Sequence, residues 1–136
     1  MRKRTLARES ALKILYRIEI SRDSVESSIE DFWSTESCVR EVKDFADFLV
    51  KGTHENLPKI DDIISKYADN WELKRIAVID KNILRMSIFE MLYMKDIPVK
   101  VSINEAIDLA KKYGDVDSGK FVNGILDKVK ETQCAT

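Results

Sequence analysis

The stretch from Val101 to Lys130 carries two runs of apolar residues at a spacing of three or four, and this spacing predicts two amphipathic helices. Ser102 and Glu105 have the spacing of a capping box, so the first helix is expected to begin there. Gly114 is placed to end that helix in a left-handed turn, and Asp117 is placed to cap the second one. A pair of helices joined by a tight corner is therefore expected.

The second of these helices also carries residues that the helical pattern does not require. Gly124 lies in its interior, where glycine costs roughly 1 kcal/mol relative to alanine. We expect that its missing side chain permits a close contact with another helix. The helix start holds a polar group with one aromatic residue, namely Asp117, Ser118, Lys120, Phe121 and Asn123. This group is the first candidate for a binding surface.

Helical periodicity continues through the rest of the chain, and no segment alternates with period two for long enough to predict a strand. Thr5 is expected to cap a first helix that runs to about Ile20. Later boundaries follow from turn and capping signals. These are a capping box at Asp23 and Glu26, an end or kink at Gly52, a start near Pro58, a helix over Asp80–Tyr93 and an extended connection at Ile97-Pro98.

Seven helices joined by short corners predict a compact all-α bundle, and 136 residues fit a single domain, 1–136. About three helices precede Gly52 and about four follow it, which predicts two sub-bundles over roughly 1–52 and 53–136. The two cysteines lack metal spacing, and no apolar run approaches the roughly 20 residues that span a bilayer. We therefore expect a soluble, cytoplasmic protein with no membrane contact.

The charge distribution predicts one cationic edge on a nearly neutral body. Residues 1–22 contain seven basic and two acidic residues, a net charge of +5. Residues 23–72 have a net charge of −8, and residues 73–136 have a net charge of +2. The total of −1 argues against a uniformly basic groove for nucleic acid.

Motifs of known catalytic or cofactor sites do not occur in the sequence. It has no glycine-rich phosphate loop, no nucleophile elbow and no HExxH pattern. The single histidine, His54, has no cysteine or carboxylate at ligand spacing. We expect no enzymatic activity, no cofactor and no metal site.

A few basic and aromatic residues lie at the border of the predicted buried faces. Single-stranded RNA is bound by stacking its bases on aromatic rings and by placing Lys and Arg against its phosphates. Arg4, Arg8 and Tyr16 on the first helix, with Lys120, Phe121 and Asn123 on the last, supply these groups if the two helices lie together. The alternatives are a solvated N-terminal face and a core role for Phe121.

The sequence resembles the NusB family of transcription antitermination factors. Four motifs carry this resemblance, and the last two are the most specific because helical periodicity does not dictate their polar residues. They are RxxARExALKxLY at Arg4–Tyr16, WxLxRIAxxDxxILRM at Trp71–Met86, IPVKVSINEAIDLAKKYG from Ile97 and DSGKFVNGILDKV from Asp117. Residues 23–70 match in apolar pattern only.

The resemblance implies a non-enzymatic, all-helical factor that binds boxA-type RNA together with a small-subunit ribosomal protein, NusE. The pair would help RNA polymerase read through terminators, notably in rRNA operons. Two sets of residues are carried over by their motifs. For RNA these are Arg4, Arg8, Tyr16, Asp117, Lys120, Phe121 and Asn123, and for the protein partner Asp80, Arg75 and Lys81.

Two other functions stay open at this point. One is a helical adaptor that binds a protein and never touches RNA. The other is a stand-alone relative of the RNA-binding domain of an rRNA cytosine methyltransferase, which is disfavoured because no catalytic domain follows in the sequence. The oligomeric state is also open, and a homodimer would be able to cover the N-terminal flank.

Overall fold

A computed structural model describes residues 2–69 and 72–134, and this part of the chain is helical with no strand. It contains seven α-helices and one short 3₁₀ helix, which confirms the all-α prediction. Trp71, the first residue of one motif, lies outside the described residues. The chain divides into two compact units, Met1–Glu55 and Asn56–Thr136.

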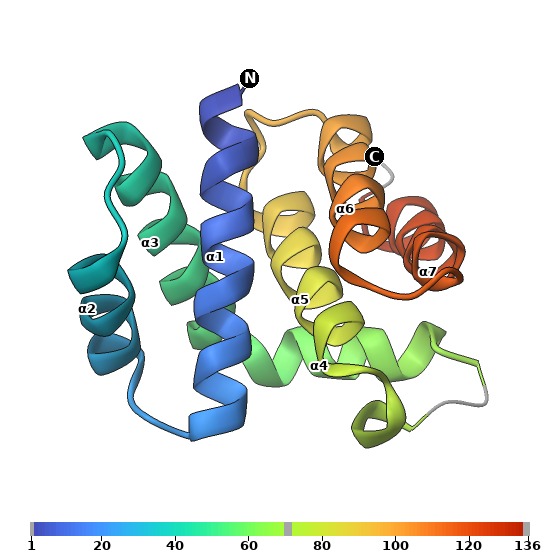
Figure 1. The fold of residues 1–136 in the computed structure, drawn as a ribbon. Coiled ribbons are helices and arrows are strands. Elements are labelled where there is room, and N and C mark those ends of the chain that lie inside the picture. Colours follow the sequence, from blue (N-terminus) through green and yellow to red (C-terminus); the bar gives the residue numbers. More distant parts are fainter. Residues whose placement is uncertain (1, 70–71, 135–136) are drawn as a thin grey trace. The chain divides into compact units, whose positions relative to one another are not determined.

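The first unit consists of three helices, α1 (Arg2–Ser21), α2 (Val25–Thr35) and α3 (Arg40–Glu55). Helices α1 and α3 pack along each other, with α2 beside them (Figure 1). Their apolar faces meet in a core because apolar residues recur at helical spacing on both helices. The core residues include Ala7, Ala11, Ile14, Val42, Ala46, Leu49 and Val50.

Two predicted helix starts in the first unit are wrong, and α3 does not end at Gly52. Helix α1 already begins at Arg2, so Thr5 lies within it and does not cap it. Ser24, rather than Asp23, is the N-cap of α2, and its hydroxyl accepts a hydrogen bond from the Ser27 amide at 3.0 Å. Helix α3 continues through Gly52, which is buried within it.

The second unit consists of α4 (Leu57–Tyr67), the 3₁₀ helix η1 (Leu73–Arg75), α5 (Val78–Tyr93), α6 (Val99–Tyr113) and α7 (Ser118–Gln133). Helix α5 contacts α4, α6 and α7, and it is buried almost all round (Figure 1). The apolar residues at its centre, Ile83, Leu84, Ile88 and Met91, are all buried. Helix α5 is therefore the central helix of the unit.

Polar groups on α5 are paired with neighbouring helices. The Arg85 guanidinium donates to both carboxylate oxygens of Asp61, at 2.8 and 3.0 Å. Ser102 on α6 donates its hydroxyl hydrogen bond to Oε1 of Glu90 at 2.9 Å, and both side chains are buried. These bonds satisfy charged and polar groups that would be costly to bury alone.

The predicted start of α6 is wrong, because this helix begins at Val99 directly after Pro98. Ser102 is only 2% exposed and contacts α5 through Glu90, so it is not a cap. Gly114 is also not left-handed, since its φ is −99° and its ψ is −163°. A Cβ at this position would lie 2.7 Å from the Ser118 Cβ and 2.9 Å from the Ala110 carbonyl oxygen, so close packing explains the glycine.

The expectation for Gly124 is wrong as well. In the described part of the chain, no heavy atom beyond the helix itself lies within 4 Å of a Cβ built at Gly124. The residue is exposed on α7, so no helix packs closely against it.

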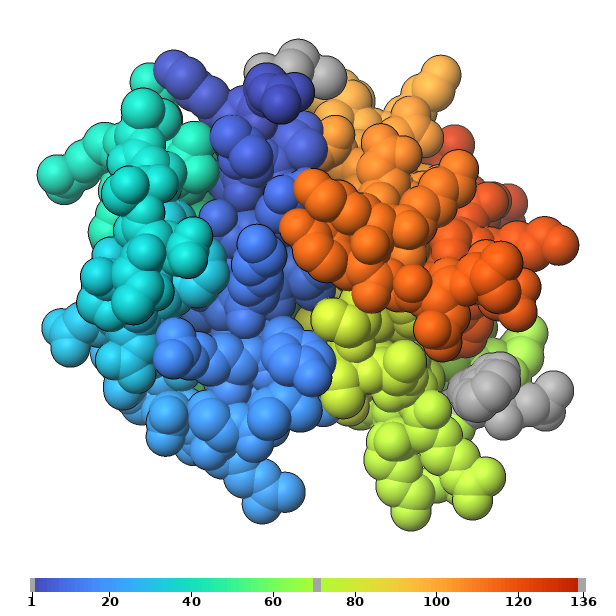
Figure 2. All heavy atoms as spheres, viewed as in Figure 1, coloured from blue at the N-terminus to red at the C-terminus, as the bar shows by residue number. Residues whose placement is uncertain are grey.

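Among the helices of the described residues, none combines the length and apolar character needed to cross a membrane. Figure 2 shows one face of the molecule, on which atoms of α6 and of the start of α7 lie next to one another.

Candidate nucleic-acid interface

In the first unit, the three candidate residues lie on α1, and two of them contact an aromatic ring of α3. The guanidinium carbons of Arg4 and Arg8 lie 4.5 and 5.6 Å from the centroid of the Phe45 ring. Arg4 is exposed, whereas Arg8 is only 3% exposed. Tyr16 is 40% exposed. Cation–π contacts of this kind fix the direction of an arginine side chain. The contact with Phe45 could not be predicted from helical periodicity.

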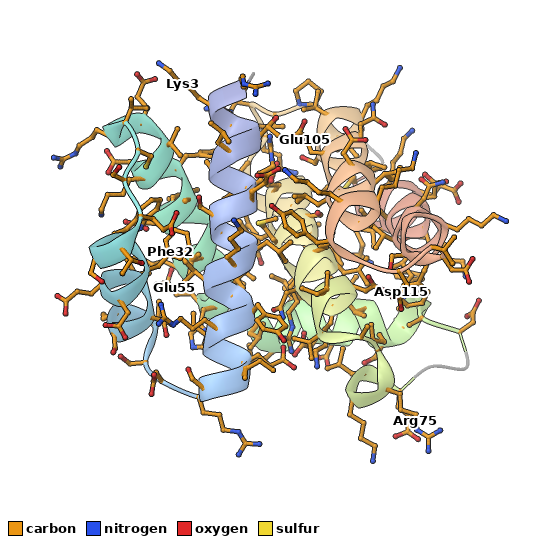
Figure 3. All side chains as sticks on the ribbon, viewed as in Figure 1. Lys3, Phe32, Glu55, Arg75, Glu105 and Asp115 are labelled. Carbon is orange, nitrogen blue, oxygen red and sulfur yellow. The ribbon has the colours of Figure 1, made fainter. Side chains whose placement is uncertain are left out.

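An ion pair lies next to these arginines. Lys3 Nζ is 3.1 Å from Glu41 Oε1, between α1 and α3 (Lys3 is labelled in Figure 3). Both side chains are more than half exposed, so the pair adds little stability. Lys3 is therefore partly neutralised, and the exposed Arg4 is the better placed cation for an anionic ligand.

In the second unit, the other candidate residues lie at the start of α7. Asp117 occupies the N-cap position but makes no side-chain capping hydrogen bond, so the prediction that it caps the helix is wrong. Instead, the Ser118 hydroxyl accepts a hydrogen bond from the Asp115 amide at 2.8 Å. Lys120 is exposed, while Phe121 and Asn123 are half-buried.

Phe121 lines two separate cavities of the second unit. The first, which we call the acidic cavity, has a volume of about 330 Å³ and is lined mainly by Arg75, Asp80, Asp115, Asp117, Ser118 and Phe121. The second, which we call the lysine groove, has a volume of about 240 Å³ and is lined mainly by Tyr67, Asp69, Lys120, Phe121, Gly124 and Lys128. One aromatic residue, Phe121, is thus shared by two cavities of different charge.

The acidic cavity contains a carboxylate that is not fully paired. Asp80, in the first turn of α5, is only 9% exposed, and its Oδ1 has no hydrogen-bond partner among the described residues. Burial raises the pKa of the Asp80 carboxyl, a hydrogen bond from Ser118 opposes this rise, and the negative charge of Asp115 adds to it. A buried, unpaired carboxylate oxygen favours a cationic or hydrogen-bond-donating ligand.

The other two residues predicted for the protein partner are separated by the structure. Arg75 lies on η1 and lines the acidic cavity with Asp80, and Figure 3 shows Arg75 and Asp115 in this unit. Lys81 is buried and lines a different cavity with Glu72, Leu73 and Lys74. The structure therefore brings together Asp80, Arg75, Asp117 and Phe121, and it does not bring Lys81 to them.

Sequence reasoning missed Asp115 and Lys128 as cavity residues. Asp115 lies in the corner before α7, and Lys128 lies almost two turns beyond Phe121 on α7, 2.7 Å from Asp69. The signal for Lys128 was available, since residues seven positions apart lie on one helix face.

Comparison with known proteins identifies the family. The model of the NusB family matches residues 5–131. Transcription antitermination protein NusB of Anaeromyxobacter dehalogenans is 48% identical over 128 residues, which cover 93% of this chain and 89% of that protein. Its counterpart in Thermodesulfovibrio yellowstonii is 46% identical, with 97% and 95% covered.

Solved structures agree with this result. NusB of T. maritima is 42% identical with a TM-score of 0.88, covering 95% of this chain and 91% of that one. A chain in the structure of the antitermination factors NusB and NusE in complex with dsRNA is 27% identical with a TM-score of 0.88, covering 96% and 98%. From its matching motifs, its helical fold and these relatives, the chain belongs to the NusB family of transcription antitermination proteins.

Proposed function

We propose that this protein is a non-enzymatic, cytoplasmic antitermination factor that binds boxA-type RNA together with NusE, a small-subunit ribosomal protein. The relatives are named as antitermination proteins. A similar chain lies in a solved structure of NusB and NusE in complex with dsRNA. In this role the bound pair keeps RNA polymerase elongating through terminators. The observation that carries the proposal is the pair of differently charged cavities that share Phe121.

The RNA side of the proposal uses exposed cations and aromatic rings. Lys120 and Phe121 line the lysine groove, where a base can stack on the ring while the ammonium group meets a phosphate. Asn123, half-buried one turn into α7, adds a hydrogen-bonding side chain for base edges. The first unit supplies further cations, Arg4 and Arg8, and a further ring, Tyr16. Arg4 is the more accessible of the two arginines.

The protein side of the proposal uses the acidic cavity. Asp80, Asp115 and Asp117 give the cavity a negative charge. Asp80 Oδ1 has no hydrogen-bond donor among the described residues. Ribosomal proteins are rich in basic side chains, and a single arginine or lysine from such a partner would satisfy this oxygen. A charge-assisted hydrogen bond to a buried carboxylate is stronger than one between neutral groups.

The shared ring gives a physical reason for cooperation between the two ligands. A partner in the acidic cavity packs against one side of Phe121 and restricts its rotamers, so a base that stacks on the ring loses less conformational freedom. Thermodynamic linkage then requires that RNA strengthens partner binding by the same factor.

Titration of labelled boxA-like RNA, with and without the ribosomal partner, tests the proposal. We expect weak binding of RNA alone and binding at least about tenfold tighter with the partner, or about 1.4 kcal/mol of coupling. A scrambled RNA of the same length is the control for sequence preference. The slope of log K against log salt should be about −0.7 for each phosphate contact. Partner binding without any RNA binding would instead support the adaptor function.

A further inference from the structure

Gly124 has no structural explanation in the described part of its chain. It lies in the middle of α7 with ordinary helical backbone, and the chain has no glycine with positive φ among its described residues. Glycine is among the least favourable residues in a helix interior. Among the described residues, space for a side chain is open, because no atom beyond the helix lies within 4 Å of a Cβ built there. An alanine would fit and would stabilise the helix.

The surroundings of Gly124 show which ligand would need its bare backbone. The residue lines the lysine groove, between Phe121 one turn before it and Lys128 one turn after it. Lys120 lies at the same groove and is exposed. One face of α7 thus presents, in chain order, an ammonium group, an aromatic ring, a glycine without a side chain and a second ammonium group.

Tyr67, another residue that lines the groove, is hydrogen-bonded to the end of α7. The Thr132 hydroxyl donates to the Lys128 carbonyl oxygen at 2.7 Å, so Thr132 Oγ1 accepts from the Tyr67 hydroxyl. Gln133 Nε2 donates to the same Tyr67 oxygen at 3.4 Å. These bonds restrain the Tyr67 side chain at the end of α4, and a restrained side chain loses less entropy when a ligand binds.

We infer that the lysine groove continues beyond Phe121 into a second nucleotide subsite, in which the RNA chain that leaves the base stacked on Phe121 passes over the bare backbone of Gly124 and places its next phosphate at Lys128. This inference rests on the proposed function. The missing side chain lets the ribose and phosphate approach the helix closely, as glycine does elsewhere where backbone meets ligand. The Gly124 cost in helix stability is then balanced by affinity for RNA.

The carboxylate of Asp69 reduces the positive charge that this subsite offers to a phosphate. Its Oδ2 lies 2.7 Å from Lys128 Nζ, and the Asp69 side chain is largely exposed while that of Lys128 is half-buried. A phosphate at Lys128 would compete with this carboxylate, which weakens the contact without preventing it. Removing the Asp69 charge should therefore strengthen RNA binding, a gain of function that a purely structural ion pair would not give.

Substitution of Gly124 in the full-length protein tests the inference by two readouts with opposite signs. Gly124→Ala should raise Tm by about 3–5 °C, because it removes the helix penalty of glycine. The same change should weaken binding of labelled boxA-like RNA about three- to tenfold, and the bulkier Gly124→Gln should weaken it more than tenfold. Asn104→Ala, at an exposed position of α6, is a matched control that improves helix propensity and should leave RNA affinity unchanged.

Charge variants complete the experiment. Lys128→Gln should reduce the salt slope of RNA binding by about 0.7, and Asp69→Asn should tighten binding about two- to fivefold. A Gly124→Ala protein that is more stable yet binds RNA as the wild type does would overturn the inference while the proposed function stands. Wild-type protein that does not bind RNA at all would instead remove the proposed function, and the inference with it.

Discussion

The acidic cavity and the lysine groove share Phe121 but differ in how they present charge. In the acidic cavity the main charged group, Asp80, is buried and lacks one hydrogen-bond partner in the described structure. In the lysine groove the cations are on the surface, and Lys128 is already paired with Asp69. A buried charge discriminates strongly between partners, whereas exposed charges attract many anions in a salt-dependent way.

This difference suggests a division of work between the two sides of one ring. A folded protein partner can bring a side chain into a preformed cavity and satisfy a buried oxygen. A single-stranded RNA has phosphates at regular intervals and flat bases, which suit a groove with exposed ammonium groups and an aromatic wall. The first consequence to test is that a change in Phe121 affects both ligands.

Phe121→Ala should have the largest effect. We expect RNA affinity to fall about ten- to one hundredfold, because stacking of a base on an aromatic ring contributes roughly 1–3 kcal/mol. Fluorescence anisotropy with labelled RNA would measure this. Leu126→Ala is the matched control on the same helix, since Leu126 is fully buried and its truncation should cost about 2–5 kcal/mol of stability with RNA affinity kept in the folded protein. The reverse pattern would show that Phe121 is a core residue.

Asp80→Asn should weaken binding at the acidic cavity and leave binding at the lysine groove nearly unchanged. Loss of the buried charge is expected to weaken partner binding about tenfold, roughly 1.4 kcal/mol, while RNA binding by the protein alone changes less than about twofold. Isothermal titration with the ribosomal partner measures the first effect. Equal losses for both ligands would mean that the cavities do not divide the work in this way.

The exposed Arg4 and the buried Arg8 of the first unit should differ in their effect on RNA binding, as the exposed and buried charges of the two cavities do. Arg4→Gln, at an exposed position, should weaken RNA binding a few-fold and lower the salt slope by about 0.7. Arg8→Gln, at a buried position over Phe45, should mainly cost stability, by about 1–2 kcal/mol. Chemical denaturation and salt-dependent RNA binding on both variants provide the comparison, and a larger loss of RNA affinity for Arg8→Gln would favour a direct contact by Arg8.

The smallest expected effect is a pH dependence that belongs to the acidic cavity. Burial raises the pKa of Asp80 above its ordinary value of 3.8, so the folded protein holds this proton more tightly than the unfolded chain. Ionisation of Asp80 therefore costs stability as pH rises from about 3.8 through the raised pKa of the folded state. The stability of Asp80→Asn relative to wild type should rise over this interval and then level off, as urea unfolding at several pH values can measure. A flat difference would show that Asp80 has an ordinary pKa in the folded protein.

Much of the fold could be predicted because helix periodicity is strong in this chain. The buried residues of α5, such as Ile83 and Leu84, follow directly from apolar spacing. Several helix boundaries were predicted wrongly, because a Ser-x-x-Glu spacing also occurs inside helices, as at Ser102 and Glu105 of α6. At Ser102 the hydroxyl meets Glu90 of another helix, which no local pattern reveals.

The candidate site could be predicted only in part. The motif around Phe121 pointed to the start of α7, which lines both cavities, but the cavities also depend on residues from other segments, including Asp115, Tyr67 and Asp69. Gly124 shows the limit most clearly. Its position in a helix was evident, but whether a neighbour fills the space beside it depends on tertiary structure.

The hydrogen bonds at the start of α7 give the molecule an intrinsic spectroscopic reporter. The Asp115 amide donates to the Ser118 hydroxyl, and the same hydroxyl donates to the Asp80 carboxylate. A cation that binds Asp80 withdraws electron density along this relay, so the amide proton resonance of Asp115 should move upfield as the cavity fills. One crosspeak in a proton–nitrogen correlation spectrum would thus count occupied acidic cavities, even while RNA is bound on the other side of Phe121.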